Sequence, residues 1–228
     1  MMYLSKEQIA RMIDISAVKS DSSMEEVELV VKAAKKYQFI CVFTLPSFAA
    51  YAKKLLSGET EIGLGGTVGF PSGASTTSSK CFEATELINL GCSELDMVMN
   101  IGKLKSNLYQ EVATDIKKIV EIAGIIPVKV ILEVDVLTGS EIQDGAKIIR
   151  DNGAKFVKTG TGWLGATSFE HIRLIKEAVG ESIQLKVAGG VRHLDVLLKM
   201  HDIGVSRFGI GNKSAINIME EFARNNKG

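Results

Sequence analysis

The sequence predicts a (β/α)₈ barrel, an α/β fold with a closed parallel sheet. Short apolar runs alternate with longer amphipathic segments, eight of each, along 228 residues. Strands that alternate with helices in this way form a parallel sheet. The number of repeats fits a closed barrel, which typically needs about 250 residues. An open doubly wound sheet is the second candidate. No linker interrupts the alternation, so we expect a single domain over residues 1–228.

The expected strands are short apolar runs, and the expected helices show apolar residues at three- and four-residue steps. The segment 24–36 illustrates the helical pattern, because Val27, Val30 and Val31 share one face and charged residues occupy the other. We place the strands at 12–16, 39–43, 62–68, 94–99, 128–134, 155–159, 183–188 and 206–210. We place the helices near 24–36, 47–57, 76–90, 108–123, 140–152, 168–179, 193–203 and 213–225.

Composition excludes several classes of protein. Lys and Arg number 27 and Asp and Glu 27, with no block of like charge, so we expect neither a nucleic-acid binder nor a protein of anionic membranes. The most apolar stretch, 119–137, carries four charged residues, too many for a membrane span. Three cysteines without a Cys-x-x-Cys spacing indicate a reducing, cytoplasmic setting. The three histidines match no metal-binding spacing, so we expect no metal.

Charged residues occur inside several expected strands, where a parallel sheet covered on both faces should be apolar. In a barrel, the apolar face of each strand meets the helices and the charged face points inward. A buried charge costs several kcal/mol, on the order of its desolvation penalty, unless it is paired. The inward charges must therefore neutralise one another, bind a ligand, or both. They are Asp14, Glu94, Asp96, Lys129, Glu133, Asp135, Lys158 and Lys186, with 133 and 135 assigned to a strand over 128–136.

Three of these charges lie towards the carboxyl ends of their strands, where barrel active sites are built: Asp96, Lys158 and Lys186. The two lysines fall on successive strands, which usually lie about 4.8 Å apart. Two ammonium groups at this distance repel each other, so the pKa of one must fall and leave a neutral, nucleophilic amine. That amine is what Schiff-base catalysis requires. For Glu94, Lys129 and Asp135 we favour a structural ion-pair network.

Glycine-rich turns follow the last three expected strands: 160–162, 189–190 and 209–211. Backbone amides in such turns, next to helix N-termini, can hold a phosphate. The alternative is that tight barrel loops simply need glycine. Trp163 follows the first of these turns, and it is either a pocket wall or part of the loop packing.

Four segments carry a resemblance to a known family. They are TVGFPSGASTTSSKCFEA (67–84), ELDMVMNIGKLKS (94–106), GAKFVKTGTG (153–162) and LKVAGGVR (185–192). Through them the sequence resembles the deoxyribose-phosphate aldolase family, lysine-dependent class I aldolases with a (β/α)₈ barrel. The resemblance implies that Lys158 forms the Schiff base, that Lys186 lowers the pKa of Lys158, and that Asp96 moves protons.

The resemblance also implies the reaction and its partners. The reaction would be reversible cleavage of 2-deoxy-D-ribose 5-phosphate to acetaldehyde and glyceraldehyde 3-phosphate, without a cofactor or a metal. The partner would be this small sugar phosphate, and the family suggests a homo-oligomer, a dimer or higher. The residues expected to bind substrate are Asp14, Thr159, Gly160, Gly162, Gly189, Gly190, Gly211, Asn212 and Lys213.

The sequence departs from the family pattern around the substrate. The family's Thr-Ser-Thr-Gly becomes 159–162, Thr-Gly-Thr-Gly, and a phosphate-binding serine pair becomes Gly211-Asn212. A cysteine of the second strand is replaced by Phe43. Lys213, at a helix start, could replace the serines electrostatically. The alternatives are therefore a class I aldolase for another sugar or sugar phosphate and, more remotely, a non-catalytic sugar-phosphate binder.

Overall fold

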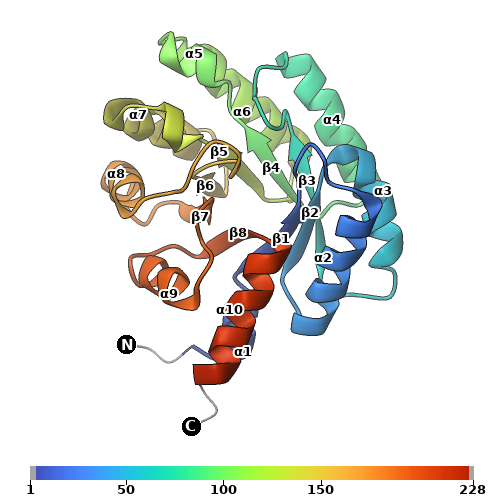
Figure 1. Ribbon diagram of the computed structural model, residues 1–228. Coiled ribbons are helices and arrows are strands. Elements are labelled where there is room, and N and C mark those ends of the chain that lie inside the picture. Colours follow the sequence, from blue (N-terminus) through green and yellow to red (C-terminus); the bar gives the residue numbers. More distant parts are fainter. Residues whose placement is uncertain (1–3, 226–228) are drawn as a thin grey trace.

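Eight parallel strands close into a barrel in chain order, with β8 paired to β1. The computed structural model describes residues 4–225, and Figure 1 shows the helices surrounding the sheet. This confirms the predicted (β/α)₈ barrel and excludes the open sheet. The strands are β1 Ile13–Ala17, β2 Cys41–Thr44, β3 Gly63–Val68, β4 Glu94–Val98, β5 Val128–Ile131, β6 Phe156–Lys158, β7 Gln184–Ala188 and β8 Arg207–Gly211.

The eight predicted helices are present, each with bounds within a few residues of the expected ones. They are α2 Met24–Tyr37, α3 Pro46–Leu55, α4 Thr77–Leu90, α6 Tyr109–Ala123, α7 Gly139–Asp151, α8 Phe169–Val179, α9 Leu194–Asp202 and α10 Asn212–Asn225. Three short elements were not predicted: α1 Lys6–Ala10, α5 Ile101–Lys105 and the 3₁₀ turn η1 Val134–Val136. Each spans five residues or fewer, too short to show a helical period.

Local capping explains several of the helix ends. Ser23 caps α2, and its hydroxyl accepts the backbone N–H of Glu26. At α7, Thr138 and Glu141 form a capping box in which each side chain bonds the other's backbone N–H. Gly153 follows α7 with a φ of +81°, the left-handed backbone that its glycine permits.

The predicted strand over 128–136 is wrong at its carboxyl end. β5 ends at Ile131, and Glu133 adopts a left-handed backbone with φ of +59°. The carboxylate of Glu133 turns towards the next loop, where the backbone and side chain of Thr161 donate hydrogen bonds to it. Asp135 then lies in η1 and is exposed, so it does not belong to the interior of the barrel.

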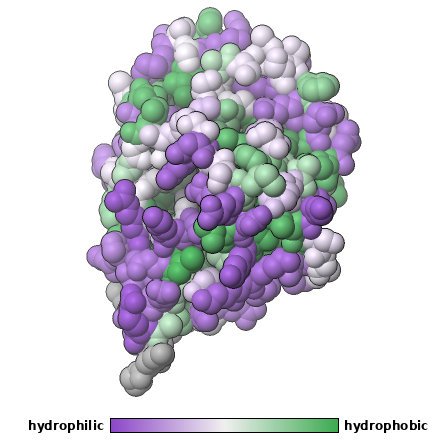
Figure 2. Space-filling model, turned by 45° about the vertical axis from the view of Figure 1, so that its right-hand side comes forward, coloured by the Kyte–Doolittle hydropathy of each residue, from purple (hydrophilic) through white to green (hydrophobic). Residues whose placement is uncertain are grey.

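The strands separate an apolar outer layer from a charged interior. On β5, Val128 and Val130 face the helices, whereas Lys129 faces the barrel axis and is completely buried. Among residues 4–225, no helix is long and apolar enough to cross a bilayer. Figure 2 turns forward the side that carries α2 and α3, and hydrophilic residues cover much of it, with hydrophobic residues interspersed.

Candidate active site

Asp96, Lys158 and Lys186 meet inside the barrel, as the sequence predicts. The Oδ2 atom of Asp96 accepts a hydrogen bond from Lys158 Nζ at 2.7 Å and another from Lys186 Nζ at 2.6 Å. Register explains the meeting, because Lys158 pairs directly with Lys186 across β6 and β7. The carboxylate of Asp96 is 1% exposed, so these two ion pairs are shielded from water.

A second set of ion pairs extends this cluster towards the amino ends of the strands. Lys186 Nζ also lies 2.6 Å from Asp14 Oδ2, and Asp14 Oδ1 accepts a bond from Arg207 Nη1 at 2.6 Å. Arg207 Nη2 donates to Glu94 Oε1 at 2.8 Å. Glu94 in turn accepts from Lys129. Asp14 is therefore buried within the ion cluster, with Lys186 between it and Asp96.

The cluster holds one more cation than it has carboxylates. Burial most strongly lowers the pKa of Lys158, Lys186 adds to this effect and Asp96 opposes it, and the net pKa is about 8. Burial alone would raise the pKa of Asp96, but the three nearby lysines hold it below its ordinary value. The cluster thus leaves Lys158 as the amine that loses its proton near neutral pH. Its members are the carboxylates Asp14, Glu94 and Asp96 and the cations Lys129, Lys158, Lys186 and Arg207.

Lys158 is also the cluster's lysine at the open end of the barrel. It is the last residue of β6, and its side chain is 8% exposed, whereas Lys129 and Lys186 are exposed by at most 1%. Glu94 and Arg207 are the first residues of their strands, so they close the opposite end. A molecule that reaches the cluster's free amine therefore arrives from the carboxyl ends of the strands.

Phe43 fills the middle of the barrel beside two of these lysines. Its ring centroid lies 4.2 Å from Lys186 Nζ and 4.6 Å from Lys129 Nζ, within the range of cation–π attraction. The ring also lies over Gly65, where a Cβ atom would come within 2.3 Å of ring carbons. Gly65 is thus required by the ring that replaces the expected cysteine.

The loop after β6 is fixed by buried polar contacts. Thr159 Oγ1 lies 2.7 Å from Thr167 Oγ1 and accepts the backbone N–H of Ala188, so its hydroxyl faces the next loop rather than the barrel mouth. Thr161 Oγ1 donates to Glu133 Oε2 at 2.6 Å. A Cβ atom at Gly160 would lie 2.9 Å from Glu133 Oε1, so a serine there would crowd this carboxylate.

The glycine turns after β6 and β7 pack against each other. Gly189 and Gly190 have φ values of +93° and +88°, and Cβ atoms there would meet Gly165 and Ala166 within 2.7 Å. Gly162, with φ of +81°, lies against Gly189. These turns are thus brought together at the carboxyl ends of neighbouring strands.

The predicted glycine turn at 209–211 is wrong, because these residues form the end of strand β8, which passes directly into α10. Gly211 ends the strand and has open space where a side chain would lie, and Asn212 begins the helix. Lys213 is exposed. Pairing of β7 with β8 places this junction beside the loop after β7. The structure therefore groups the residues predicted to bind substrate at the carboxyl ends of the strands. The exception is Asp14, which lies on β1 inside the ion cluster.

One buried group has the donor types of a metal site: Asp14, Cys41 and Glu94 hold ligand atoms within 4.8 Å of one another. Both carboxylates already pair with Arg207. Burial, together with the two carboxylates, raises the pKa of the Cys41 thiol well above its ordinary value and keeps it protonated. These residues do not fit a metal ion, because a cation there would compete with an arginine and a lysine.

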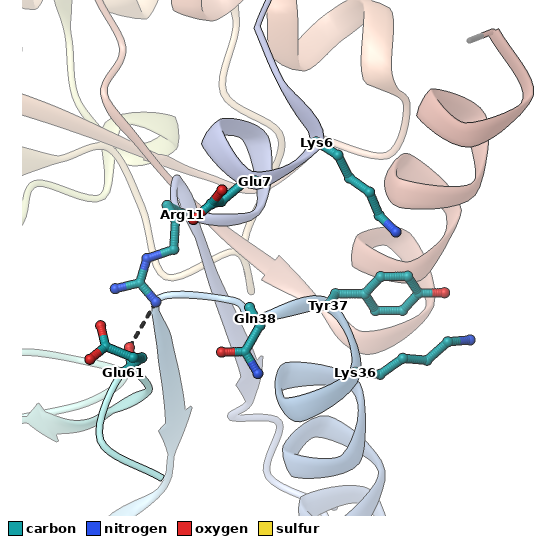
Figure 3. Close-up of a pocket in the computed structure, with 7 residues that line it drawn as sticks. All are labelled: Lys6, Glu7, Arg11, Lys36, Tyr37, Gln38 and Glu61. Atoms are coloured by element: carbon teal, nitrogen blue, oxygen red, sulfur yellow. Dashed lines mark hydrogen bonds between the residues drawn. The ribbon is translucent and has the colours of Figure 1, made fainter. Parts of the chain in front are cut away.

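A surface pocket of about 380 Å³ lies at the opposite end of the barrel from Lys158. Its residues precede β1, β2 or β3 or belong to α1 and α2, and Figure 3 shows Arg11 bonded to the backbone of Glu61. Its position separates it from the ion cluster. The lining residues are Lys6, Glu7, Arg11, Lys36, Tyr37, Gln38 and Glu61.

Two residues of the site were not assigned a function from the sequence. Arg207 alternates with Gly209 and Gly211 along an expected strand, and this alternation could have placed it inward. The sequence predicts Glu133 on the inner face of a strand, but the left-handed backbone that turns it away leaves no signature in the sequence.

Comparison with known proteins identifies the family to which this chain is similar. The sequence model described as "DeoC/LacD family aldolase" matches residues 8–214. A deoxyribose-phosphate aldolase of Rhizobium meliloti is 40% identical over 221 residues, covering 96% of this chain and 89% of that protein.

Solved structures give the same result. An aldolase named QR15 superposes with a TM-score of 0.88 at 32% identity, over 95% of this chain and 96% of the other. A tetrameric deoxyribose phosphate aldolase from Aeropyrum pernix has a TM-score of 0.84 at 26% identity, over 96% of this chain and 92% of the other. The similarity therefore covers both the fold and nearly the whole sequence.

Proposed function

Because the chain belongs to the DeoC/LacD family of aldolases, we propose that it is a class I aldolase that reversibly cleaves 2-deoxy-D-ribose 5-phosphate to acetaldehyde and glyceraldehyde 3-phosphate. The observation that carries this proposal is the environment of Lys158. Its amine is buried next to Asp96 and Lys186, has a pKa of about 8, and lies at the accessible end of the cluster. An amine in this state is a nucleophile near neutral pH.

In the cleavage direction, neutral Lys158 attacks C1 of the open-chain sugar. Loss of water from the resulting carbinolamine gives a protonated imine. Removal of the proton from the C3 hydroxyl breaks the C2–C3 bond, and its electron pair moves onto the imine nitrogen to form an enamine. Glyceraldehyde 3-phosphate leaves. Protonation of the enamine at C2 and addition of water then release acetaldehyde and the free lysine.

Asp96 is our candidate for the proton transfers, because its carboxylate contacts Lys158 directly and also contacts Lys186, which we assign as a proton donor. With a bound water, Asp96 removes and returns protons at the reacting carbon and oxygen atoms. Lys186 lies 2.6 Å from the same carboxylate oxygen, and its charge favours the neutral form of Lys158. Asp14 pairs with Lys186 and so acts on the reaction by positioning that lysine, in place of the direct contact with substrate expected from the sequence.

The substrate phosphate is assigned to the loops at the carboxyl ends of β6, β7 and β8. Backbone amides of the glycine turns and the first turn of α10 are suited to a phosphate, and Lys213 supplies a positive charge there. Of the residues predicted to bind substrate, Thr159 is excluded from direct contact, because its hydroxyl bonds Thr167 and Ala188 and its backbone N–H bonds Lys186. The residues assigned to substrate are Gly160, Gly162, Gly189, Gly190, Gly211, Asn212 and Lys213.

A second candidate is the same chemistry on a different sugar or sugar phosphate. It is favoured by Gly211, which has open space where the family carries a serine, and by Phe43, whose ring takes the place of a cysteine. Both changes alter the volume available to a substrate and leave the lysines and the aspartate in place.

We further propose that residues 1–228 act as one domain, in the cytoplasm, as a homo-oligomer and without cofactor or metal. The tetramer reported for the Aeropyrum pernix aldolase supports the oligomer. The absence of a disulfide among Cys41, Cys81 and Cys92, which are all free thiols, supports a reducing compartment.

Borohydride trapping tests the proposal. The protein is incubated with 2-deoxyribose 5-phosphate or with deoxyribose, reduced, and mapped by peptide mass analysis. We expect an adduct on Lys158 that forms more readily with the phosphorylated sugar. Lys158→Leu should lose both adduct and turnover, while Lys155→Arg, an exposed lysine on the same segment, should keep them. A stronger adduct with unphosphorylated sugar selects the second candidate, and an adduct on another lysine contradicts the mechanism.

A further inference from the structure

Trp163 connects three loops at the open end of the barrel. Its indole Nε1 donates a hydrogen bond of 3.0 Å to the backbone oxygen of Val18, which directly follows β1. Its ring meets that of Phe70, two residues after β3, edge to face with centroids 5.7 Å apart. We call Trp163, Phe70 and Val18 the aromatic bridge.

Strand order shows where this aromatic bridge must lie. In a closed ring of eight strands, β6 stands opposite β2, and β1 and β3 flank β2. Trp163 belongs to the loop after β6, yet it contacts the loops after β1 and β3. Contacts between loops that start on opposite sides of the ring place the indole at the barrel mouth. Lys158 lies at that same end, and the other end is closed by Arg207 and Glu94.

The aromatic bridge is fixed at its base and loosely held at its tip. The backbone N–H of Trp163 donates to Thr161 Oγ1 at 3.1 Å, and that hydroxyl donates to the buried carboxylate of Glu133. Within residues 4–225, the indole makes one hydrogen bond and one ring contact, and the residue is 40% exposed. Because the indole is held by so few contacts, it can release Val18 and Phe70 when a ligand enters and contact them again afterwards.

We propose that Trp163 is a specificity-determining residue that covers the substrate attached to Lys158. This inference rests on the proposed function. The aldehyde carbon that bonds Lys158 lies deepest, so the remainder of the substrate extends towards the mouth and beneath the indole. An apolar cover there excludes bulk water from the imine and favours short, linear hydroxyaldehyde phosphates over bulky aldehydes.

Kinetics in the synthetic direction test the cover directly. Acetaldehyde is the donor, and glyceraldehyde 3-phosphate is compared with phenoxyacetaldehyde as acceptor. In Trp163→Ala, we expect a higher KM for glyceraldehyde 3-phosphate with kcat little changed, and a ratio of the two kcat/KM values shifted about tenfold or more towards the bulky acceptor. Trp163→Phe should stay near the parent ratio. The control Leu164→Ala, which alters the adjacent exposed residue, should leave the ratio unchanged.

A second measurement separates this inference from the proposed function. Trp163 is the sole tryptophan of the chain, so acrylamide quenching of its fluorescence reports on the aromatic bridge without any turnover. We expect glyceraldehyde 3-phosphate to protect Trp163 from quenching. Loss of imine trapping with protection intact overturns the aldolase assignment and leaves Trp163 as a cover over a sugar phosphate that is bound without attachment to Lys158. Trapping at Lys158 with unchanged quenching, or an unchanged acceptor ratio in Trp163→Ala, overturns the cover and keeps the aldolase.

Discussion

Lys158 differs from an ordinary lysine because its neighbours act on its charge in opposite directions. Burial disfavours the ammonium form most strongly, Lys186 adds a repulsion, and Asp96 opposes both. The resulting pKa of about 8 leaves an appreciable neutral fraction at physiological pH. Since one neighbour is a cation and the other an anion, replacing each one should move the pKa in a different direction.

The pH dependence of imine formation follows from these signs. Only the neutral amine attacks a carbonyl, so the rate with acetaldehyde should rise with pH and level off above a midpoint near 8. Lys186→Met removes a repulsion and should move the midpoint to higher pH. Asp96→Asn removes an attraction and should move it to lower pH. The measurement is the initial rate of adduct formation under cyanoborohydride between pH 6 and 10, and midpoints that move together would contradict this account.

Two helices of the outer layer are joined to the sheet by a buried ion pair. Lys80 of α4 is completely buried, and its Nζ donates to Asp115 Oδ2 of α6 at 2.6 Å and to the backbone oxygen of Val98 at 2.9 Å. Burial lowers the pKa of Lys80, and Asp115 counteracts that effect. The pair thus connects α4, α6 and the carboxyl end of β4.

Replacing one partner of this ion pair should lower the free energy of unfolding more than replacing both partners. Lys80→Met leaves the Asp115 carboxylate buried without a cation, and we expect a loss of about 3–5 kcal/mol in the free energy of unfolding. The double variant Lys80→Met, Asp115→Leu removes both charges and should recover most of that loss. The control is Lys199→Met on α9, whose pair with Asp195 is exposed and should matter little. Urea unfolding measures all three, and a double variant as unstable as the single one would disprove the argument.

At the scale of the whole molecule, charge takes the place of an apolar layer inside the barrel. Members of the ion cluster come from β1, β4, β5, β6, β7 and β8, while β2 contributes the ring of Phe43. Segments separated by up to 193 residues are joined directly, as Arg207 is to Asp14. The same groups that prepare Lys158 therefore also close the sheet.

This arrangement predicts sensitivity to acid. The pKa of Asp96, raised by burial but lowered more strongly by three lysines, lies below its value in the unfolded chain. A carboxylate of this kind stabilises the fold above its unfolded pKa, and the contribution is lost as pH falls towards its folded pKa. The free energy of unfolding should therefore fall steeply below about pH 4. Asp96→Asn should be less stable at pH 7 but show a shallower decline, and parallel curves in denaturant titrations would contradict this.

Much of the barrel and of its inner ion cluster could be predicted from the sequence, because period and strand order fix which residues face inward. Those two properties were enough to bring Asp96, Lys158 and Lys186 together, and their catalytic roles remain part of the proposal. Glu133 and Asp135 could not be placed in the same way, since β5 ends at Ile131 when the chain enters a left-handed turn. That turn depends on the hydrogen bonds from Thr161, which lies 28 residues further along the chain.

The contacts of Trp163 were also outside the reach of the sequence. They join loops that follow β1, β3 and β6, and no local pattern relates these segments. The depth of Asp14 has a similar origin. Whether a residue on an inner face contacts a ligand or another charge depends on the strand register around the full ring, which links Asp14 to Gly209 of β8.

Strand β1 pairs with β8, and α1 packs beside α10, so the first and last segments of the barrel are neighbours. The fold therefore does not depend on which strand comes first in the sequence. Gly124 and Gly180 lie in exposed turns between a helix and the next strand, with open space around them, on the side of the molecule away from Lys158. A circularly permuted protein, with the original ends joined and new ends at either glycine, would keep every strand neighbour and every loop at the carboxyl ends of the strands intact. The two lysines of β6 and β7 would then lie at opposite ends of a sequence reopened at Gly180, and they would still meet at Asp96.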